Sequence, residues 1–298
     1  MLTVEDYRRV YADEIRFVAN LTSPALVEAF ARVPREQFIG PGPWRVGSPE
    51  LRVLAAVGLA EASYTDVDDP RHLYHNVVVV MDEAGDINNG QPSALARWIS
   101  ALDLEPGARV YHLGCGVGYY TAIMAEVVGP EGSVVGSEVN KDLAERARQN
   151  LAAYGNVQVY SADGAEMDPG ECDAMLINAG VTHPHRMWLD RLREGGRLVV
   201  PITIATSATL GAGLMIKIVR RGDSFAVRGV APVGIYSCIG MRDATMEPLL
   251  RKALVSQELL KVKSLRLEPH EEEETCLAHG ASACFSKAEI DASQSSYC

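Results

Sequence analysis

Three alternating glycines, Gly114, Gly116 and Gly118, form the segment of this 298-residue sequence that is best suited to chemistry. A predicted strand at residues 109–113, with apolar side chains at 110, 111 and 113, precedes them, and a predicted helix begins at Tyr119. Glycines at this spacing let the backbone turn tightly and approach a ligand that a β-carbon would exclude. The unpaired N–H groups at the start of a helix face the same place. The segment predicts a nucleotide-binding turn, with a simple tight turn as the alternative.

Acidic residues after the next two predicted strands strengthen this interpretation. Glu138 lies twenty residues beyond Gly118, at the end of a strand, where an acidic side chain accepts hydrogen bonds from ribose hydroxyls. Asp163, followed by Gly164, comes after the third strand, where its carboxylate could accept a hydrogen bond from an adenine amino group. Taken singly, each acid is better explained as a surface residue at a strand end. In this order behind a glycine turn, they predict a nucleotide site.

The spacing of the glycines in the turn indicates which nucleotide is bound. NAD-binding turns usually have the pattern G-x-G-x-x-G, whereas the glycines here follow G-x-G-x-G. A Gly-Gly-Arg turn at residues 195–197, before the apolar run at residues 198–201, is a second discriminating feature. This arrangement resembles the class I S-adenosylmethionine-dependent methyltransferases more than the dehydrogenases, so NAD is the less favoured ligand.

Strands and helices must alternate to position these residues. Apolar strand-like runs and helical stretches alternate from residue 91 to residue 201, which predicts a mostly parallel sheet covered on both faces. Residues 214–220 and 225–233 predict an antiparallel hairpin at one sheet edge. We therefore expect a doubly wound, Rossmann-like α/β fold. The expected domains are an N-terminal helical lid, a cofactor-binding core and a C-terminal appendage, at residues 1–90, 91–235 and 236–298.

Flanking segments carry clearer local signals at the N-terminus than at the C-terminus. Thr3 and Ser23-Pro24 predict the starts of two helices, and residues 51–62 are apolar enough for another. Residues 66–70 are predicted as an acidic turn. A helix to residue 260 and a strand over residues 262–267 are expected near the C-terminus.

Four segments together resemble the protein-L-isoaspartate O-methyltransferase family. They are a helix ending in Val-Pro-Arg-Glu-Gln-Phe, a Gln-Pro-Ser segment, the glycine turn with its flanks, and Gly-Gly-Arg-Leu-Val-Val-Pro, at residues 29–38, 91–93, 104–122 and 195–201. The resemblance implies a class I methyltransferase fold and S-adenosylmethionine as cofactor. It implies cofactor contacts at Gly114, Cys115, Gly116, Gly118, Tyr119, Glu138, Asp163, Gly164, Gln91, Ser93 and His112.

Two positions depart from the family pattern. The family carries a serine of the isoaspartyl site directly before Gln-Pro, where this sequence has Gly90. It also carries a glutamate two residues before the first glycine of the turn, where this sequence has His112. The first change removes a hydroxyl, so we expect the same cofactor and fold with a diverged acceptor.

Candidate residues for the methyl-transfer step follow the fourth predicted strand, in the segment from Asn178 to His185. Ligands bind outside the carboxyl ends of strands in open α/β sheets, so this loop should face the methyl group. Asn178 is the candidate polar wall, and His183 or His185 is the candidate general base. Alternatively, one histidine caps the following helix and the other is solvated.

Three functional hypotheses follow. The first is O-methylation of a carboxylate on a peptide or a small molecule, which needs no base because a carboxylate is already nucleophilic. The second is methylation of a small-molecule N, S, O or C atom in a specialised pathway, with a histidine base. The third is a non-catalytic cofactor-binding scaffold.

Composition limits the partners. A net charge of −11 opposes binding to nucleic acid or to an anionic membrane, since both demand a basic face. No apolar run reaches the length of a membrane-spanning helix, and the acidic start does not fit a signal peptide. Six cysteines without CxxC spacing predict reduced thiols in a cytoplasmic protein, with no metal site. A homodimer is possible.

Charge is concentrated near the C-terminus. Residues 268–298 carry six of the eleven net negative charges and three of the six cysteines. The net negative charge therefore comes more from this stretch than from the catalytic core. This distribution weakens the exclusion of anionic partners. A solvated tail is the favoured interpretation, with a subunit contact or a lid over the acceptor site as alternatives.

Overall fold

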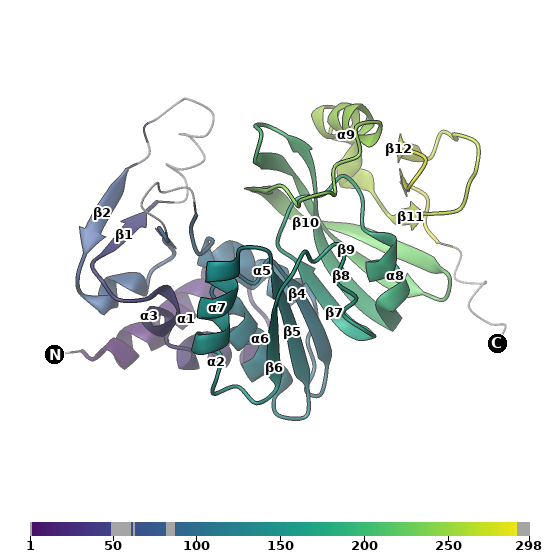
Figure 1. Cartoon of the computed structure of the whole chain (residues 1–298). Helices are drawn as coiled ribbons and strands as arrows, with labels where there is room; N and C mark the ends of the chain where they lie inside the picture. Colours follow the sequence, from purple (N-terminus) through teal and green to yellow (C-terminus); the bar gives the residue numbers. More distant parts are fainter. Residues whose placement is uncertain (1, 49–60, 62, 82–86, 291–298) are drawn as a thin grey trace. The chain divides into compact units, whose positions relative to one another are not determined.

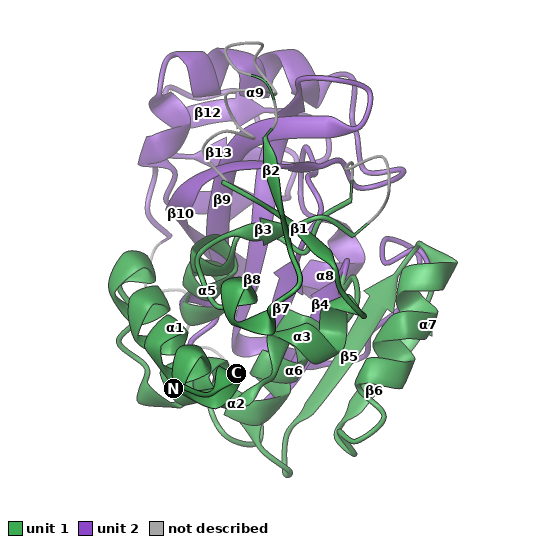
Figure 2. Ribbon diagram, turned by 90° about the vertical axis from the view of Figure 1, so that its left-hand side faces the viewer, with its two compact units in different colours: residues 1–100, 104–107, 115–161 green, residues 101–103, 108–114, 162–298 purple. Residues whose placement is uncertain are grey.

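The computed structural model describes residues 2–48, 61, 63–81 and 87–290 (Figure 1). The chain divides into two compact units, shown in Figure 2. Unit 1 comprises residues 1–100, 104–107 and 115–161, and unit 2 comprises residues 101–103, 108–114 and 162–298. This division follows spatial contacts and leaves the expected boundaries after residues 90 and 235 as predictions.

Unit 1 opens with the helices predicted from their caps. Helix α1 (Val4–Ala19) begins at Thr3, whose hydroxyl accepts from the Asp6 N–H while the Asp6 carboxylate accepts from the Thr3 N–H. Helix α2 (Pro24–Arg32) begins at the predicted Ser23 cap. The short helix α3 (Arg35–Ile39) follows.

A three-stranded antiparallel sheet follows these helices in unit 1. Its strands lie in the order β2-β1-β3, and their bounds are β1 (Trp44–Gly47), β2 (Tyr64–Val67) and β3 (Val78–Val79), with the 3-10 turn η1 (Pro70–Leu73) between the last two. The predicted acidic turn at residues 66–70 is wrong for its first part, since Asp66 pairs with Arg45 within β2 and β1. The predicted helix at residues 51–62 lies almost wholly outside the described residues.

Arg35 holds helix α3 to the segment before β3. Its guanidinium is fully buried, and it donates to the carbonyl oxygens of Leu73 at 2.6 Å and Val77 at 2.7 Å. A buried cation of this kind must be hydrogen-bonded, because an unpaired one costs several kcal/mol. The Val-Pro-Arg-Glu segment therefore has a structural role rather than that of a surface charge.

The rest of unit 1 is strand–helix alternation close to the prediction. Its elements are α5 (Pro92–Ala101), α6 (Tyr119–Val128), β5 (Ser133–Glu138), α7 (Lys141–Asn150) and β6 (Val157–Ser161). Strands β5 and β6 are parallel and in continuous register. Their carboxyl ends therefore lie at one edge, where Glu138 ends β5.

Unit 2 contains an eight-strand succession in the order β12-β13-β11-β10-β9-β8-β7-β4. Strands β4, β7 and β8 pair in parallel, and the remaining pairs are antiparallel. The bounds are β4 (Arg109–Leu113), β7 (Cys172–Ile177), α8 (Arg186–Arg191), β8 (Leu192–Ala205), β9 (Leu210–Arg221), β10 (Ser224–Tyr236), α9 (Met246–Val255), η2 (Glu258–Lys261), β11 (Ser264–Arg266), β12 (Cys276–His279) and β13 (Cys284–Ser286).

The predicted hairpin is confirmed as β9 and β10, but it does not form the edge. Phe225 and Ala226 of β10 pair with Leu265 and Ser264 of β11, so further strands continue the sheet beyond the hairpin. Strand β11 lies within the predicted strand at residues 262–267. Strands β12 and β13 are only four and three residues long, which explains why the sequence did not predict them.

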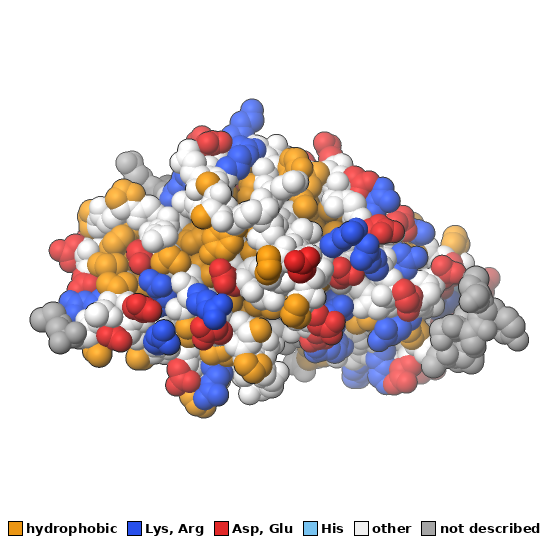
Figure 3. Space-filling model, turned by 90° about the horizontal axis from the view of Figure 1, so that it is seen from below, with side chains coloured by type: hydrophobic (Ala, Val, Ile, Leu, Met, Phe, Trp, Pro, Cys, Tyr) orange, Lys and Arg blue, Asp and Glu red, His pale blue; other side chains and the backbone are white. Residues whose placement is uncertain are grey.

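The favoured solvated tail is wrong for residues 275–286, whereas residues 268, 269 and 271–274 are exposed. Phe285 and Ser286 of β13 are fully buried, and Ala278 of β12 is nearly so. Three of its acids form ion pairs, Glu289 with Lys263 and both Glu268 and Glu273 with Arg266. Acidic and basic side chains are interspersed over the face drawn in Figure 3, so the net charge is not gathered into one patch there. Within the described residues no helix is long and apolar enough to cross a membrane.

Candidate functional site

The glycine turn leads directly into helix α6 of unit 1. Gly116 has a φ of +56° and Gly118 a φ of +91°, the left-handed region that disfavours other residues. A β-carbon built on Gly118 would lie 2.6 Å from Leu151 Cδ1, so this glycine lets α6 pack closely against the end of α7. A β-carbon on Gly116 would meet no described atom within 4 Å. Gly116 therefore presents an open backbone surface.

Glu138 faces this turn from the end of β5. Its side chain is buried, and its two oxygens accept from the N–H groups of Gly116 at 2.9 Å and Asn140 at 3.0 Å. An ionised carboxylate has about four acceptor positions, so these two bonds leave others for ligand hydroxyls. The carboxylate is thus fixed in place before any ligand arrives.

Two other residues predicted in the turn have buried side chains. Tyr119 packs edge-on against Phe30 and Phe38, with ring centroids 6.5 and 5.6 Å away. Burial, followed by the Glu138 charge, raises the pKa of the Cys115 thiol well above its usual value, so the thiol stays protonated. Only the backbone of Cys115 and Tyr119 remains to contact a ligand.

Residues 90–93 prepare the start of helix α5. The Gln91 side-chain amide donates to the Ser93 hydroxyl at 3.1 Å, and the Ser93 N–H donates to Asn76 Oδ1 at 3.0 Å. Gly90 has a φ of +77°, and a β-carbon there would lie 2.9 Å from Leu95 Cδ2. The serine hydroxyl of the family pattern is thus absent, and the backbone conformation at Gly90 disfavours any side chain.

In unit 2, His112 lies within β4 and is buried. Burial lowers the pKa of His112 to about 3, so the imidazole is neutral at physiological pH. It therefore cannot supply the negative charge of the glutamate that the family carries at this position.

Asp163 and Gly164 follow β6 and begin the part of unit 2 that leads to β7. Asp163 Oδ1 accepts from the Ala165 N–H at 2.9 Å, which orients the carboxylate. The Gly164 carbonyl accepts from the Tyr111 hydroxyl at 3.2 Å and from Trp188 Nε1 at 3.1 Å. A β-carbon on Gly164 would lie 2.5 Å from Leu113, so this glycine is required by packing.

Asn178 ties the carboxyl ends of β7 and β4 together. Its N–H donates to the Leu113 carbonyl at 2.9 Å, and its side-chain amide donates to the Gly114 carbonyl at 3.3 Å. Gly114 has a φ of +73°, and a β-carbon there would lie 3.2 Å from the Asn178 carbonyl oxygen. Asn178 thus lies beside the start of the glycine turn, and its role as a wall of the site stays a prediction.

His183 is held in one orientation by its neighbour. The Thr182 hydroxyl donates to the Met241 carbonyl at 3.3 Å and lies 3.1 Å from His183 Nδ1. Because its one proton points to Met241, the hydroxyl accepts from Nδ1–H, and the lone pair of His183 lies on Nε2. Burial lowers the pKa of His183, an effect that the Asp243 carboxylate opposes and His185 reinforces. His183 is therefore a neutral, half-buried imidazole with a basic Nε2.

His185 instead caps helix α8. Its Nδ1 accepts from the Met187 N–H at 3.2 Å, and its ring packs against Trp188 at a centroid distance of 5.7 Å. This matches the alternative in which one histidine of the pair is a cap. Of the two, only His185 has its Nδ1 lone pair engaged by a backbone N–H, so His183 stays the candidate base.

Sequence reasoning missed the segment after β10 that supports this loop. Cys238 N–H donates to the Gly180 carbonyl at 2.8 Å, and Asp243 N–H donates to the Thr182 hydroxyl at 3.0 Å. Nothing local marks these residues, because their role depends on a backbone carbonyl and a hydroxyl about sixty positions earlier in the chain.

Known proteins resemble this chain over most of its length. A family model described as Protein-L-isoaspartate(D-aspartate) O-methyltransferase (PCMT) matches residues 59–226, which is more than half of the chain. The chain belongs to this family. The protein-L-isoaspartate O-methyltransferase of Ignicoccus hospitalis is 30% identical over 222 residues, covering 72% of this chain and 88% of the relative. That of Methanothrix thermoacetophila is 32% identical, over 63% of this chain and 78% of the relative.

Solved structures of the family share the fold. A protein-L-isoaspartate O-methyltransferase superposes with a TM-score of 0.61 at 23% identity, covering 81% of this chain and 70% of its own. A Plasmodium falciparum methyltransferase structure in complex with S-adenosyl-L-homocysteine gives a TM-score of 0.55 at 17% identity, covering 78% and 97%. The predicted family and class I methyltransferase fold are confirmed. As a member of the family, the chain is a methyltransferase that uses S-adenosylmethionine.

Proposed function

We propose that this chain methylates a carboxylate on a peptide or small molecule that differs from the isoaspartyl substrate named for its relatives. Gly90 is the observation that carries this proposal. A serine hydroxyl is absent at this position, and the φ of +77° together with the 2.9 Å approach to Leu95 disfavours any side chain there. The acceptor is therefore recognised without the hydroxyl that the family uses.

The residues of each unit fit the cofactor on their own. In unit 1, the open Gly116 backbone and the buried Glu138 carboxylate suit a nucleoside, with Glu138 accepting from ribose hydroxyls. In unit 2, the oriented Asp163 carboxylate is the residue we assign to the adenine amino group. S-Adenosylmethionine, when bound, supplies an electrophilic methyl group on a sulfonium sulfur.

Positioning is the main contribution of the protein to this reaction. A carboxylate acceptor is already nucleophilic, so holding it in line with the methyl group supplies much of the acceleration. Asn178, fixed against Gly114, is the polar group that we assign to the wall of the site. No proton needs to move in this first candidate reaction.

A histidine-assisted reaction is the second candidate. His183 carries its lone pair on Nε2 and is kept neutral by burial, which is the state that a general base requires. An acceptor that loses a proton, such as a phenol or an amine, would give that proton to Nε2. His183 is therefore the discriminating residue between the two candidates.

Turnover with an isoaspartyl peptide tests the first proposal. We expect methyl transfer to that peptide to be at least about 100-fold slower than by an authentic isoaspartyl methyltransferase assayed beside it, a loss of about 3 kcal/mol in transition-state stabilisation. Turnover within tenfold of the control enzyme would overturn the diverged acceptor. With a native acceptor, base-labile release of methanol indicates a carboxyl methyl ester, whereas a base-stable methyl group supports the second candidate.

A further inference from the structure

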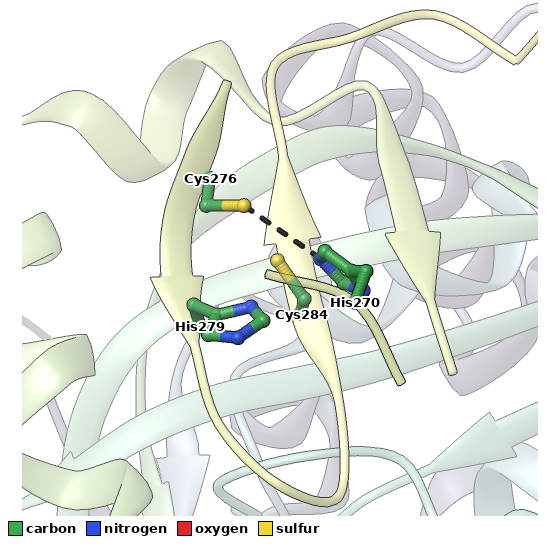
Figure 4. Close-up of side chains that lie close together, drawn as sticks. All are labelled: His270, Cys276, His279 and Cys284. Carbon is green, nitrogen blue, oxygen red and sulfur yellow. Dashed lines mark hydrogen bonds between the residues drawn. The ribbon is translucent and has the colours of Figure 1, made fainter. Parts of the chain in front are cut away.

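Four metal-binding side chains that are scattered in the sequence lie together in the C-terminal strands of unit 2. They are His270, Cys276, His279 and Cys284, and one ligand atom from each lies within 4.8 Å of all the others (Figure 4). Their spacing contains no CxxC pair, so the sequence predicted only scattered reduced thiols and no metal site. Neither the family membership nor the proposed methyl transfer uses them.

The backbone brings three of these side chains to one face. His279 and Cys284 are directly opposite each other in the antiparallel pair β12–β13, so their side chains project from the same face. Cys276 is three residues before His279 and would point to the opposite face of a regular strand. The pairing register shifts between Cys276 and Ala278, and this irregularity returns Cys276 to the shared face.

His270 completes the group from the loop after β11, and its hydrogen bond selects the ligating nitrogen. Its Nδ1 lies 2.8 Å from the Glu268 carbonyl oxygen, to which Nδ1–H donates. Its Nε2 then carries the lone pair and lies 3.7 Å from Cys276 Sγ. Metal-binding histidines commonly donate the other ring N–H to a backbone carbonyl in this way.

Two further observations fit a cation between these groups. Cys276 Sγ accepts from the Glu273 N–H at 3.3 Å, a bond that stabilises a thiolate. His279 Nδ1 is buried and has no hydrogen-bond partner among the described residues. A buried unpaired nitrogen costs about 1–3 kcal/mol, and a cation bound there would remove this cost.

We propose that His270, Cys276, His279 and Cys284 bind one zinc ion. Two thiolates and two imidazoles are the donor set of structural zinc sites, whereas magnesium and calcium require oxygen ligands. Four protein ligands leave no open position for a substrate, so the site is structural rather than catalytic. Two thiolates also neutralise the ion, which allows it to be bound beside a sheet without a further counter-charge.

Zinc at this position would add cross-links to a segment built from very short strands. Strands β11, β12 and β13 have three, four and three residues, and strands this short bury little surface. The ion would join the loop at His270 to both ends of β12 and to the start of β13. Helix α9 packs on this segment, where a β-carbon on Gly280 would lie 2.6 Å from Met246 Sδ.

Metal analysis of the full-length chain tests the proposal. The protein is stripped with a chelator under reducing conditions, reloaded with zinc or cobalt, freed of excess metal, and analysed for metal content and absorption. We expect one zinc per chain, and with cobalt the visible bands of tetrahedral coordination together with thiolate-to-cobalt charge transfer. Less than half an equivalent of zinc, or a cobalt spectrum without thiolate bands, would overturn the proposal.

Variants assign the ligands. Cys276→Ser, Cys284→Ser and His270→Ala should each lose the stoichiometric metal, whereas His270→Cys should keep it, because three cysteines and one histidine also bind zinc. Cys172→Ser is the matched control, a buried cysteine at the start of β7 outside the cluster. Zinc retained by Cys276→Ser and Cys284→Ser alike would refute the assignment. If these variants do not fold, the wild-type zinc content and cobalt spectrum still decide the matter.

Discussion

Alanine substitutions at three left-handed glycines of unit 1 separate backbone strain, packing and ligand approach. Gly107, Gly116 and Gly118 have φ values of +82°, +56° and +91°, so alanine at each costs about 1–2 kcal/mol in conformational energy. A β-carbon at Gly107 or Gly116 meets no described atom within 4 Å, whereas one at Gly118 lies 2.6 Å from Leu151. Overpacking of this kind adds about 1–3 kcal/mol.

The expected stability losses are therefore similar for Gly107→Ala and Gly116→Ala and larger for Gly118→Ala. In differential scanning calorimetry, each kcal/mol should lower the melting temperature by roughly 2–4 °C in a chain of this size. Adding Leu151→Ala to Gly118→Ala should remove the overpacking component, so the double variant should be more stable than the sum of the single losses predicts.

Ligand binding then distinguishes the two glycines with open surroundings. Gly116→Ala should weaken S-adenosylhomocysteine at least about tenfold in calorimetric titration, a cost of about 1.4 kcal/mol, because a methyl group occupies the surface we assign to the ligand. Gly107→Ala, which bears the same backbone strain away from the turn, should bind as the wild type does. Equal affinities for Gly116→Ala and Gly107→Ala would refute the placement of the ligand at Gly116.

Three more predictions concern Gly90, His112 and His183. Gly90→Ser should lower the melting temperature without giving isoaspartyl turnover, because the added β-carbon would lie 2.9 Å from Leu95 at a φ of +77°. A gain of turnover to the level of an authentic isoaspartyl methyltransferase would contradict this. The pKa of His112 is about 3 in the fold and about 6.5 unfolded, so its contribution to stability is present above pH 6.5 and is lost as pH falls toward 3. The free energy of unfolding, measured with urea, should therefore fall by about 2 kcal/mol between pH 7 and pH 5. The fall should be correspondingly smaller in His112→Gln, and an equal fall in both proteins would refute this role of His112. If His183 is the base, turnover of the native acceptor should decline only below about pH 6.5, because burial lowers the pKa of His183. His183→Ala should remove this acid limb of the pH profile. An unchanged profile in the variant excludes His183 as the base.

Local signals in the sequence predicted much of the fold. The helix starts at Thr3 and Ser23-Pro24, strand β4 and helix α6 all lie where caps, proline and apolar periodicity placed them. These features depend on residues within one or two turns, so one sequence is enough to predict them. The glycine turn belongs to the same class, because its positive φ values demand glycine whatever surrounds it.

Features that depend on distant residues were not predictable. Strands β12 and β13 are too short to show alternation, and the register shift after Cys276 hides the face that Cys276 shares with His279. The burial of Arg35 likewise depends on carbonyl groups about forty residues away. Interactions of this kind arise from the tertiary structure and leave no periodic pattern in the sequence.

Calorimetric titration of S-adenosylhomocysteine into Glu138→Gln tests the proposed cofactor site most directly. The Glu138 oxygens each accept a backbone N–H, and an amide can accept only one of them while its own N–H groups oppose the other. We predict one site in the wild-type chain and about 10–100-fold weaker binding in Glu138→Gln, equivalent to the loss of about 1.5–3 kcal/mol for a charged hydrogen bond. Glu145→Gln, an exposed change on α7, should bind as the wild type does. An affinity for Glu138→Gln equal to that of Glu145→Gln would contradict the account.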